Sequence, residues 1–384
     1  MLDTDVAILG GGCAGLSLAV ALARIAPSCR VHVLEERTEY VRDRTWCLWN
    51  AQPHPFESCV THSWNRWRVR SAGESVVRHS DRYAYQHIPA DRFYEYALQS
   101  ISASPEQQIS MGTHIQSVTP DANGFRVETN QGSLQADWVF DSRPQILLSR
   151  PQTSGLIQRF SGWHVVSERP CFDWTTVELM DFQRSDVPGR TIFFYTLPFS
   201  PHEALVEATY LDDPALASAR ADDALGDWLE KITAGSPYRV QFREQGALRM
   251  EARRSADQIP RLSRYMPIGT AGGRVKASSG YAFLRIQRQS LAIAHALANG
   301  LTPPQQLEPV RYELLDRVFM TALRRNPEAA SDYFLQLFRN VPPDELVRFL
   351  SECGSAAETI KVALSLPKLP FAAAAAASLA GDRK

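Results

Sequence analysis

A glycine-rich turn between an apolar run and an amphipathic stretch is the feature that most restricts how this 384-residue chain folds. Residues 6–9 are apolar, glycines stand at positions 10, 12 and 15, and helix-like periodicity continues to about Ile25. A second apolar run, 31–34, ends at Glu35, twenty residues beyond Gly15. This order of strand, glycine turn, helix and strand predicts a βαβ unit.

Each residue of this turn has a physical task in binding a dinucleotide. Gly10 permits the tight turn, Gly12 lets the backbone approach a pyrophosphate, and Gly15 lets the helix pack closely on the strand. The helix N-terminus, which includes Ala14, meets the negative charge, and Glu35 is placed to accept hydrogen bonds from the adenosine ribose. The pattern does not separate FAD from NAD(P), but its N-terminal position and two later segments favour FAD.

Those two segments resemble parts of FAD enzymes. An apolar strand that ends in 141–143 resembles the strand that returns beside the first turn, and the glycine-rich segment 267–281 precedes a helix. Thr270 stands where aromatic-ring monooxygenases usually carry an aspartate, which disfavours a hydroxylase. A helix that begins near Gly280 would direct the positive end of its dipole at the flavin ring. The cofactor contacts expected from these segments are Asp141, Gly269, Gly272, Gly280 and Tyr281.

The rest of the chain predicts an inserted lobe and a helical end. Residues 45–100 are expected to form an insert of a first lobe, 1–154, that is irregular or β-rich to about Ser80 and extended and then helical over 83–98. Residues 155–260 predict a mainly antiparallel β lobe with a hairpin over 191–210, and 261–309 return to the first lobe with a helix over 283–298. Residues 310–384 predict helices broken by prolines, with an alanine run at 372–377 as a helix end or a disordered tail. The expected fold class is α/β: a Rossmann-type FAD-binding fold, an inserted antiparallel β-sheet substrate lobe and a helical C-terminal region.

Composition excludes several classes of function. The formal net charge of −1 provides no electrostatic basis for binding nucleic acid. Six cysteines are scattered without zinc-type spacing, which predicts reduced thiols in a cytosolic enzyme and no metal site. The sequence contains no stretch of about 18 uncharged apolar residues, so no membrane-spanning helix is expected. No secretory signal is expected either.

Several blocks together resemble the bacterial lycopene β-cyclases. The hairpin segment 194–210 is similar to a conserved block of that family, and Glu207 stands at the place of its essential acidic residue. Segments 158–162, 178–181, 244–248, 272–281 and 349–371 resemble further blocks, so the resemblance runs over about 6–371. The chain departs from the family pattern at Arg249, Ala277 and Ser279, which leaves room for another isoprenoid substrate.

The resemblance implies an enzyme that closes the ψ-ends of lycopene, or of a related carotenoid, into β-rings with reduced FAD and no net redox. It implies Glu207 as the catalytic acid, with Asp181 as a second candidate, and it places Trp46 near the flavin. Burial of a carboxylic acid among apolar residues raises its pKa and keeps it protonated, as proton transfer to an alkene requires. Two points stay open: whether Glu207 or flavin N5 delivers the proton, and whether Glu244 holds the flavin end or structures its block.

The implied partners follow from the substrate. NAD(P)H is expected as the reductant, and no obligate protein partner is evident. A C40 hydrocarbon must be collected from a bilayer, so a cytoplasmic protein peripherally attached to the membrane is expected, through apolar residues of 333–350 or 364–371. Aromatic residues over 46–67 and 83–93 are candidates for a polyene tunnel or for plain core. The alternatives are a flavin monooxygenase or polyene reductase, and a cyclase homologue acting on another isoprenoid.

Overall fold

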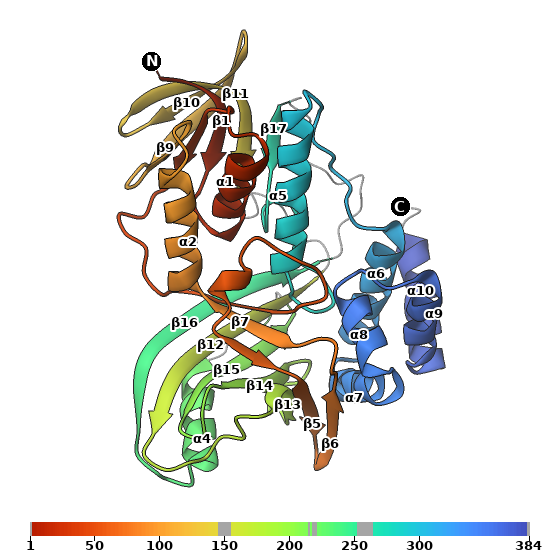
Figure 1. Ribbon diagram of the computed structural model, residues 1–384. Helices are drawn as coiled ribbons and strands as arrows, with labels where there is room; N and C mark the ends of the chain where they lie inside the picture. Colours follow the sequence, from red (N-terminus) through yellow and green to blue (C-terminus); the bar gives the residue numbers. More distant parts are fainter. Residues whose placement is uncertain (1, 145–154, 214–215, 217–220, 252–263, 382–384) are drawn as a thin grey trace.

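The structure is a computed structural model that describes residues 2–144, 155–213, 216, 221–251 and 264–381. Figure 1 shows an N-terminal lobe of sheet and helices, a second large sheet beside it, and a group of C-terminal helices along one side of the molecule. The predictions for residues 145–154 and 252–263, which include the expected boundaries at 154 and 260, lie outside the described residues.

The N-terminal lobe contains the predicted βαβ unit. β1 (Leu2–Leu9) leads into α1 (Cys13–Ile25), and β2 (Val31–Leu34) returns parallel to β1. Pro27 follows α1 and pushes Ala26 out of helical geometry. The strand order is β8-β2-β1-β11-β10-β9, with β17 (Tyr265–Pro267) parallel to β11 (Gly132–Asp141). The remaining strands of this sheet are β8 (Gln107–Ser110), β9 (Ile115–Asp121) and β10 (Gly124–Thr129).

Both faces of β1 are buried, and strand alternation decides which core each residue joins. Val6 and Ile8 pack with α1, α2 (Ala90–Ser102) and α5 (Phe283–Ala298). Ala7 and Leu9 pack on the opposite face, against residues of β10 and β11. This double burial explains why the sequence of the strand is continuously apolar.

The second sheet has seven strands in the order β16-β12-β15-β14-β13-β5-β6 and is antiparallel except where β5 and β13 pair in parallel. Its strands are β5 (Arg66–Ser71), β6 (Glu74–His79), β12 (Leu156–Ser167), β13 (Val177–Gln183), β14 (Thr191–Pro198), β15 (Glu203–Asp212) and β16 (Tyr238–Met250). The predicted hairpin is confirmed as β14–β15. α4 (Ala221–Ile232) covers the outer face, while the inner face looks toward the N-terminal lobe and the C-terminal helices.

The insert over 45–100 is regular: of the two alternatives for 45–80 the β-rich one is correct, and the extended and then helical segment is β7 followed by α2. β3 (Thr45–Trp49), β4 (His62–Trp64) and β7 (Tyr85–Pro89) form a three-stranded sheet, and η1 (Glu57–Cys59) lies between β3 and β4. β5 and β6 leave this insert and join the edge of the second sheet. The pairing joins β5 to a strand about a hundred residues later, a contact that local sequence patterns do not reveal.

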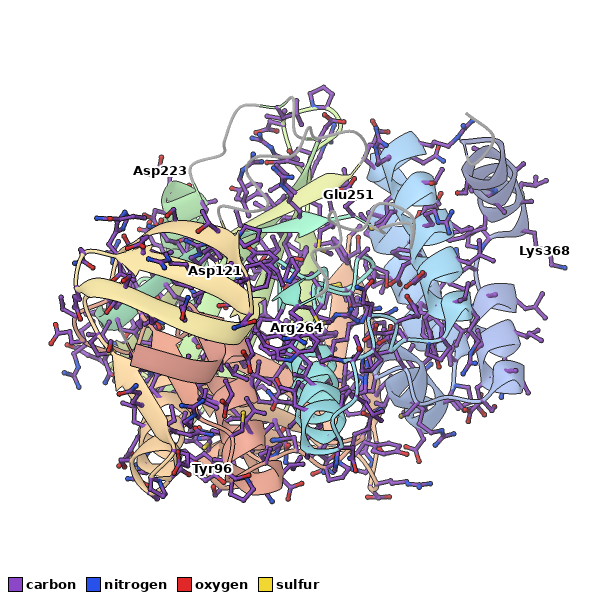
Figure 2. All side chains as sticks on the ribbon, turned by 90° about the horizontal axis from the view of Figure 1, so that it is seen from above. Tyr96, Asp121, Asp223, Glu251, Arg264 and Lys368 are labelled. Atoms are coloured by element: carbon purple, nitrogen blue, oxygen red, sulfur yellow. The ribbon has the colours of Figure 1, made fainter. Side chains whose placement is uncertain are left out.

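The C-terminal region forms α6 (Val310–Arg325), η3 (Pro327–Ala329), α7 (Ala330–Asn340), α8 (Pro343–Leu350), α9 (Ala356–Leu364) and α10 (Lys368–Gly381). The alanine run is neither a helix end nor a tail, because it lies inside α10, which packs on α6. Seen from above, Lys368 at the start of α10 lies at the outer edge of this group (Figure 2).

A buried cluster of charges ties these helices to the segment before α5. Lys276 Nζ lies 2.6 Å from Asp316 Oδ1 of α6, and Arg285 pairs with both Asp316 and Glu352. Ser278 Oγ donates to the same Asp316 at 2.6 Å. Since breaking a buried ion pair leaves an uncompensated charge, the cluster holds the glycine-rich segment 272–281 firmly against α6.

Candidate active site

The glycine turn has the geometry that the sequence predicts. Gly10 has φ +92°, which favours glycine, and a Cβ on Gly15 would lie 1.9 Å from the Gly10 carbonyl oxygen. A Cβ on Gly12 would meet no protein atom within 4 Å, because that side of the turn faces a large cavity. Gly12, Cys13 and Ala14, at the N-terminus of α1, all line this cavity.

Glu35 ends β2 beside the turn. Its Oε2 accepts a hydrogen bond from the Gly11 N–H at 2.5 Å, and its Oε1 accepts from Arg37 Nε at 2.9 Å. Burial opposes ionisation of this carboxyl, but hydrogen bonds and charge from Arg37 outweigh it, so the pKa of Glu35 is lowered. The site predicted for a ribose therefore contains a carboxylate beside the turn, and Arg37, which lines the cavity, adds a cation.

The other predicted cofactor residues divide into two groups. Trp46, Gly280 and Tyr281 line the cavity, as does Thr270. Gly269 and Gly272 allow close packing that a side chain would prevent. Cβ atoms there would lie 2.4 Å from Ala14 Cβ and 2.5 Å from the Pro267 carbonyl oxygen, respectively.

The structure does not place the predicted contact Asp141 in the cavity. The fully buried Asp141 carboxylate instead pairs with Arg143 and accepts a hydrogen bond from Tyr265. Its neighbour Ser142 lines the cavity and donates a hydrogen bond to the Gly10 carbonyl oxygen at 3.0 Å. Sequence reasoning missed Ser142, although the Asp-Ser-Arg triplet contained the signal.

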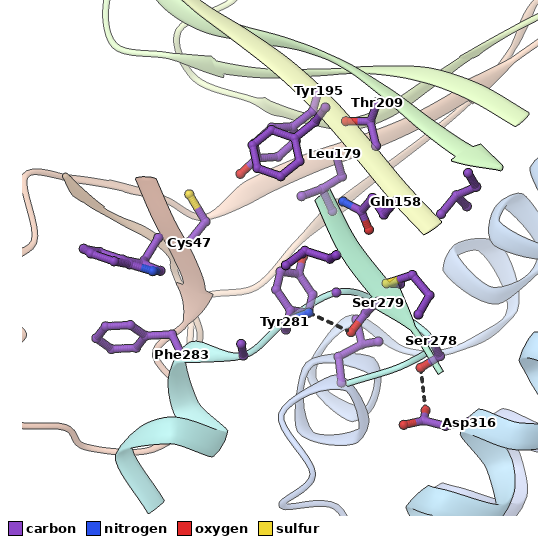
Figure 3. A pocket seen from close by; sticks show the side chains of 18 of the residues that line it. Cys47, Gln158, Leu179, Tyr195, Thr209, Ser278, Ser279, Tyr281, Phe283 and Asp316 are labelled. Atoms are coloured by element: carbon purple, nitrogen blue, oxygen red, sulfur yellow. Dashed lines mark hydrogen bonds between the residues drawn. The ribbon is translucent and has the colours of Figure 1, made fainter. Parts of the chain in front are cut away.

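The cavity has a volume of about 990 Å³ and runs from the glycine turn to the C-terminal helices. In Figure 3, Tyr195 and Thr209 of the second sheet lie across the cavity from Tyr281, while Asp316 lies below. Beyond the loop 278–282, most of the lining is apolar and comes from three sources: the inner face of the sheet, α6 to α8, and α9 with α10. A long hydrocarbon fits such walls better than a polar metabolite does.

Aromatic side chains surround the middle of the cavity. Trp46, Trp49, Tyr85, Tyr195 and Tyr281 all line it, while Trp67 and Phe93 belong to the core. Tyr195 Oη donates to Tyr85 Oη at 3.1 Å, and Tyr85 Oη lies 3.2 Å from Tyr281 Oη. Burial raises the pKa of all three phenols, so they are neutral.

Glu207 faces the middle of this cavity from β15. Its accessible surface lies toward the cavity, which is itself deep inside the protein. The predicted alternation is confirmed: Glu207 shares the inner face with Leu205 and Thr209, while Val206 and Ala208 pack on the outer face. Burial and the charge of the neighbouring Glu244 raise the pKa of Glu207 well above its ordinary value. This shift favours the protonated form of the carboxyl.

Glu244 of β16 is the cavity residue that sequence reasoning left without a role. It is buried, and its side chain lies beside that of Glu207 over Gly162. Burial raises the pKa of Glu244, while the hydrogen bond to Glu207 and the charges of Arg44 and Arg42 oppose the rise. The structure thus places Glu244 beside the acid rather than at the glycine turn.

Asp181 does not lie in this cavity. It lines a second cavity of about 1450 Å³ on the outer side of the sheet, together with Glu178, Arg68 and Arg70. The reason is an irregularity in β13 between Glu178 and Asp181, which turns both carboxyls outward while Leu179 and Met180 line the inner cavity. The geometry therefore provides no contact between Asp181 and Glu207.

Whether the residues fit a dinucleotide can be tested on the turn itself. A backbone that a ligand can approach at Gly12 and a helix N-terminus at Cys13 border one cavity, and the Glu35 carboxylate lies beside the turn, where it accepts a hydrogen bond from the Gly11 N–H. Trp46 and the loop 278–282 line the same cavity. These residues fit FAD. In the part of the chain that the structure describes, no group of three or more His, Cys, Asp or Glu side chains is arranged to hold a metal.

The fold is that of FAD-dependent oxidoreductases. It resembles a geranylgeranyl bacteriochlorophyll reductase-like protein from Thermoplasma acidophilum (14% identity, TM-score 0.65, covering 97% of this chain and 98% of that one). It also resembles a flavoprotein/dehydrogenase from Cytophaga hutchinsonii (11% identity, TM-score 0.62, covering 99% and 100%). A third similar structure is the flavin-dependent monooxygenase PieE in complex with FAD and substrate (15% identity, TM-score 0.56, covering 99% and 72%). At these identities the likeness concerns the fold.

The family is narrower than the fold. The family model described as lycopene cyclase protein matches residues 5–376, nearly the whole chain. The chain belongs to the lycopene cyclase family. A search of curated proteins gives no match.

Proposed function

We propose that this protein is a carotenoid cyclase that converts the ψ-ends of lycopene, or of a related carotenoid, into β-rings with no net redox change. The observation that supports it most directly is that Glu207, whose pKa is raised, lines a large, mainly apolar cavity in a lycopene cyclase family member. Protonation of an unactivated alkene needs an acid that keeps its proton until the substrate is in place, and it needs a site without water.

The residues supply each step of a proton-initiated cyclisation. Glu207 transfers its proton to the terminal double bond of the ψ-end and becomes a carboxylate, while a tertiary cation forms. The neighbouring double bond attacks that cation, and the ring closes. A ring C–H then returns a proton to Glu207, so that atoms and charge balance. Tyr195 and Tyr281 line the cavity, and the faces of aromatic rings attract a cation.

FAD is proposed as the cofactor, held by Gly12, Ala14, Trp46 and the loop 278–282, which line the cavity, with Glu35 beside the turn. When bound and reduced, FAD supplies negative charge beside the cation. We propose a nicotinamide nucleotide, NADH or NADPH, as the source of the electrons that reduce it. The similar structures include a reductase-like protein and a monooxygenase, so the alternative is a flavin-dependent redox reaction on an isoprenoid.

One experiment separates the two reactions. The protein is incubated anaerobically with photoreduced FAD and lycopene, without nicotinamide, and the carotenoids are separated by chromatography. A cyclase forms many rings per flavin, because the reaction consumes no electrons. Product limited to one per reduced flavin, or dependent on stoichiometric NAD(P)H, would contradict the proposal and favour a reductase or monooxygenase.

Cofactor placement is tested at Gly12. Valine at this position clashes with no protein atom, because a Cβ there extends into the cavity. Gly12→Val is therefore expected to fold normally but to purify without the yellow colour of flavin. A folded Gly12→Val protein with normal flavin content would place the cofactor elsewhere. Gly226→Ala, at a helical glycine whose added Cβ would have its nearest neighbour at 4.0 Å, is a control for expression and solubility.

We also propose that α9 and α10 attach the protein to a membrane surface. The suggested region 333–350 is mostly buried and forms cavity wall and core, so it is not the attachment surface. By contrast Ile360, Leu364 and Leu369, which we call the C-terminal apolar patch, are 60%, 67% and 85% exposed. Val362, Leu366 and Phe371 from the same helices line the end of the cavity, so the patch lies where a hydrocarbon could enter.

Among the described residues no single helix is long and apolar enough to cross a bilayer; α9 and α10 together reach that length and composition but are bent by 117°. Flotation with liposomes tests the patch. The wild type is expected to float, and Leu364→Glu combined with Leu369→Glu is expected to stay in the soluble fraction. Trp174→Glu, which changes another exposed apolar residue, is the matched control. Equal flotation of all three proteins would refute this attachment site.

A further inference from the structure

Three strands place two glutamates on either side of one glycine. In the register of the second sheet, Glu207 of β15 lies opposite Gly162 of β12, and Gly162 lies opposite Glu244 of β16. A Cβ on Gly162 would lie 2.8 Å from Glu207 Cγ and 3.1 Å from Glu244 Cγ. The two glutamate side chains therefore lean toward each other over the glycine, through space that any other residue would fill.

A hydrogen bond between two carboxyls requires a proton on one of them. Glu207 and Glu244 approach each other over Gly162 in a cavity with mostly apolar walls, so the arrangement is stable with one proton between them and unfavourable with none. We propose that Glu207 and Glu244 share a single proton, and that Glu244 is a positioning residue that keeps this proton on Glu207. The role of that proton in ring closure depends on the proposed function, whereas the sharing does not.

The surroundings decide which partner carries the proton. Around the pair stand Tyr195 of β14, Cys47 of β3, Tyr85 of β7 and Tyr281, and burial keeps these phenols and this thiol neutral. The charged neighbours are Arg42 and Arg44, and both act on Glu244. Positive charge stabilises a carboxylate, so Glu244 is the anion and Glu207 the acid.

This arrangement also resets the acid after each turnover. Once Glu207 has given its proton to the substrate, two carboxylates face each other across Gly162. Their repulsion makes Glu207 a strong acceptor for the proton that the ring must lose. Glu244 stays ionised throughout, forms no bond to the substrate and acts through Glu207.

Infrared titration of the flavin-loaded protein, without carotenoid, tests the sharing directly. The carbonyl stretching band of a protonated carboxylic acid is followed against pH in difference spectra with Glu207→Gln. In the wild type the band is expected to persist to alkaline pH. In Glu244→Gln the midpoint is expected to fall by about one pH unit or more, because the repelling charge is gone. In Glu244→Asp, which keeps the charge, it is expected to move back toward the wild type.

An unchanged midpoint in Glu244→Gln overturns the proposal, as does a band that survives in Glu207→Gln. Glu178→Gln, an acid of the outer cavity, is the control and is expected to leave the band unaltered. The same variants are then assayed for cyclisation as a function of pH. Loss of Glu244 as the proton-sharing partner is expected to move the alkaline limb of the pH–rate profile to lower pH. A merely structural defect would lower the rate equally at every pH. If the band shifts as expected but lycopene is never cyclised, the proposed function fails and the shared proton stands.

Discussion

The second sheet carries a pair of acidic residues on each face, and the two pairs differ in the groups that surround them. On the inner face, Glu207 and Glu244 meet over Gly162 in an apolar cavity. On the outer face, Glu178 lies 2.8 Å from Arg68 Nε and 3.0 Å from Arg70 Nε, and Asp181 accepts a hydrogen bond from Gln183.

The difference shows how one sheet makes an acid on one side and a structural ion pair on the other. Burial raises the pKa on both faces, but arginines oppose the rise at Glu178, while for Glu207 the neighbouring charge is another carboxylate and adds to it. Proton donation is therefore expected from the inner pair and not from the outer one. The following changes test that contrast.

The largest effect is expected from Glu207→Gln. Glutamine keeps the size and hydrogen-bonding shape of the side chain but has no acidic proton. Ring closure should fall by about 10²-fold or more, the contribution typical of a general acid, with folding and flavin content unchanged. Chromatographic assay of β-ring formation measures it, and wild-type turnover by this variant would end the assignment of Glu207.

A smaller effect is expected from Gly162→Ala, which alters the inner pair without removing either carboxyl. The added methyl would lie 2.8 Å from Glu207 Cγ, so the two acids must move apart. Ring formation should fall by about 10-fold, and the free energy of unfolding by about 1–3 kcal/mol, the usual cost of overpacking. Gly226→Ala, on α4 with its nearest neighbour 4.0 Å away, is the matched control. Equal activity of the two variants would show that the pair needs no close approach.

Stability should also depend on pH through the inner pair. Because the pKa of Glu207 is raised in the folded protein, the native state holds a proton that the unfolded chain releases. Stability is then fully present below the ordinary pKa of glutamate and declines as pH rises toward the raised pKa, by at most about 1.4 kcal/mol per pH unit. Glu207→Gln lacks this decline, so its free energy of unfolding should exceed that of the wild type at neutral and alkaline pH. Denaturant unfolding at several pH values measures the gap, and parallel curves would argue against a buried neutral acid.

The smallest effect is expected from Asp181→Asn on the outer face. Asparagine retains an oxygen for Gln183, and the side chain does not reach the inner cavity. Ring formation should stay within about 3-fold of the wild type, since no proton transfer depends on it. A loss as large as that of Glu207→Gln would restore Asp181 as a catalytic residue and erase the contrast between the faces.

Much of the architecture could be predicted because it depends on short-range patterns. The glycine spacing at 10, 12 and 15 indicated a βαβ unit, and the helix over 283–298 follows from its periodicity. Alternation along 204–210 placed Glu207 on a face with Leu205 and Thr209. In each case the residues that decide the structure are neighbours in the chain, so local sterics and burial suffice.

Other features depend on contacts between distant segments. An irregularity in β13 turns Asp181 outward, and the local sequence of Glu178–Asp181 does not predict it. The strand pair β5–β6 left the first lobe for the edge of the second sheet. The roles of Gly162 and Glu244 depend on Glu207, because the assembled sheet places the glycine between the two glutamates. Neighbours in the sequence predict the strand in which a residue lies and the face on which it stands. The pKa of its side chain depends on the charges that surround it in space, and the register between strands sets those charges.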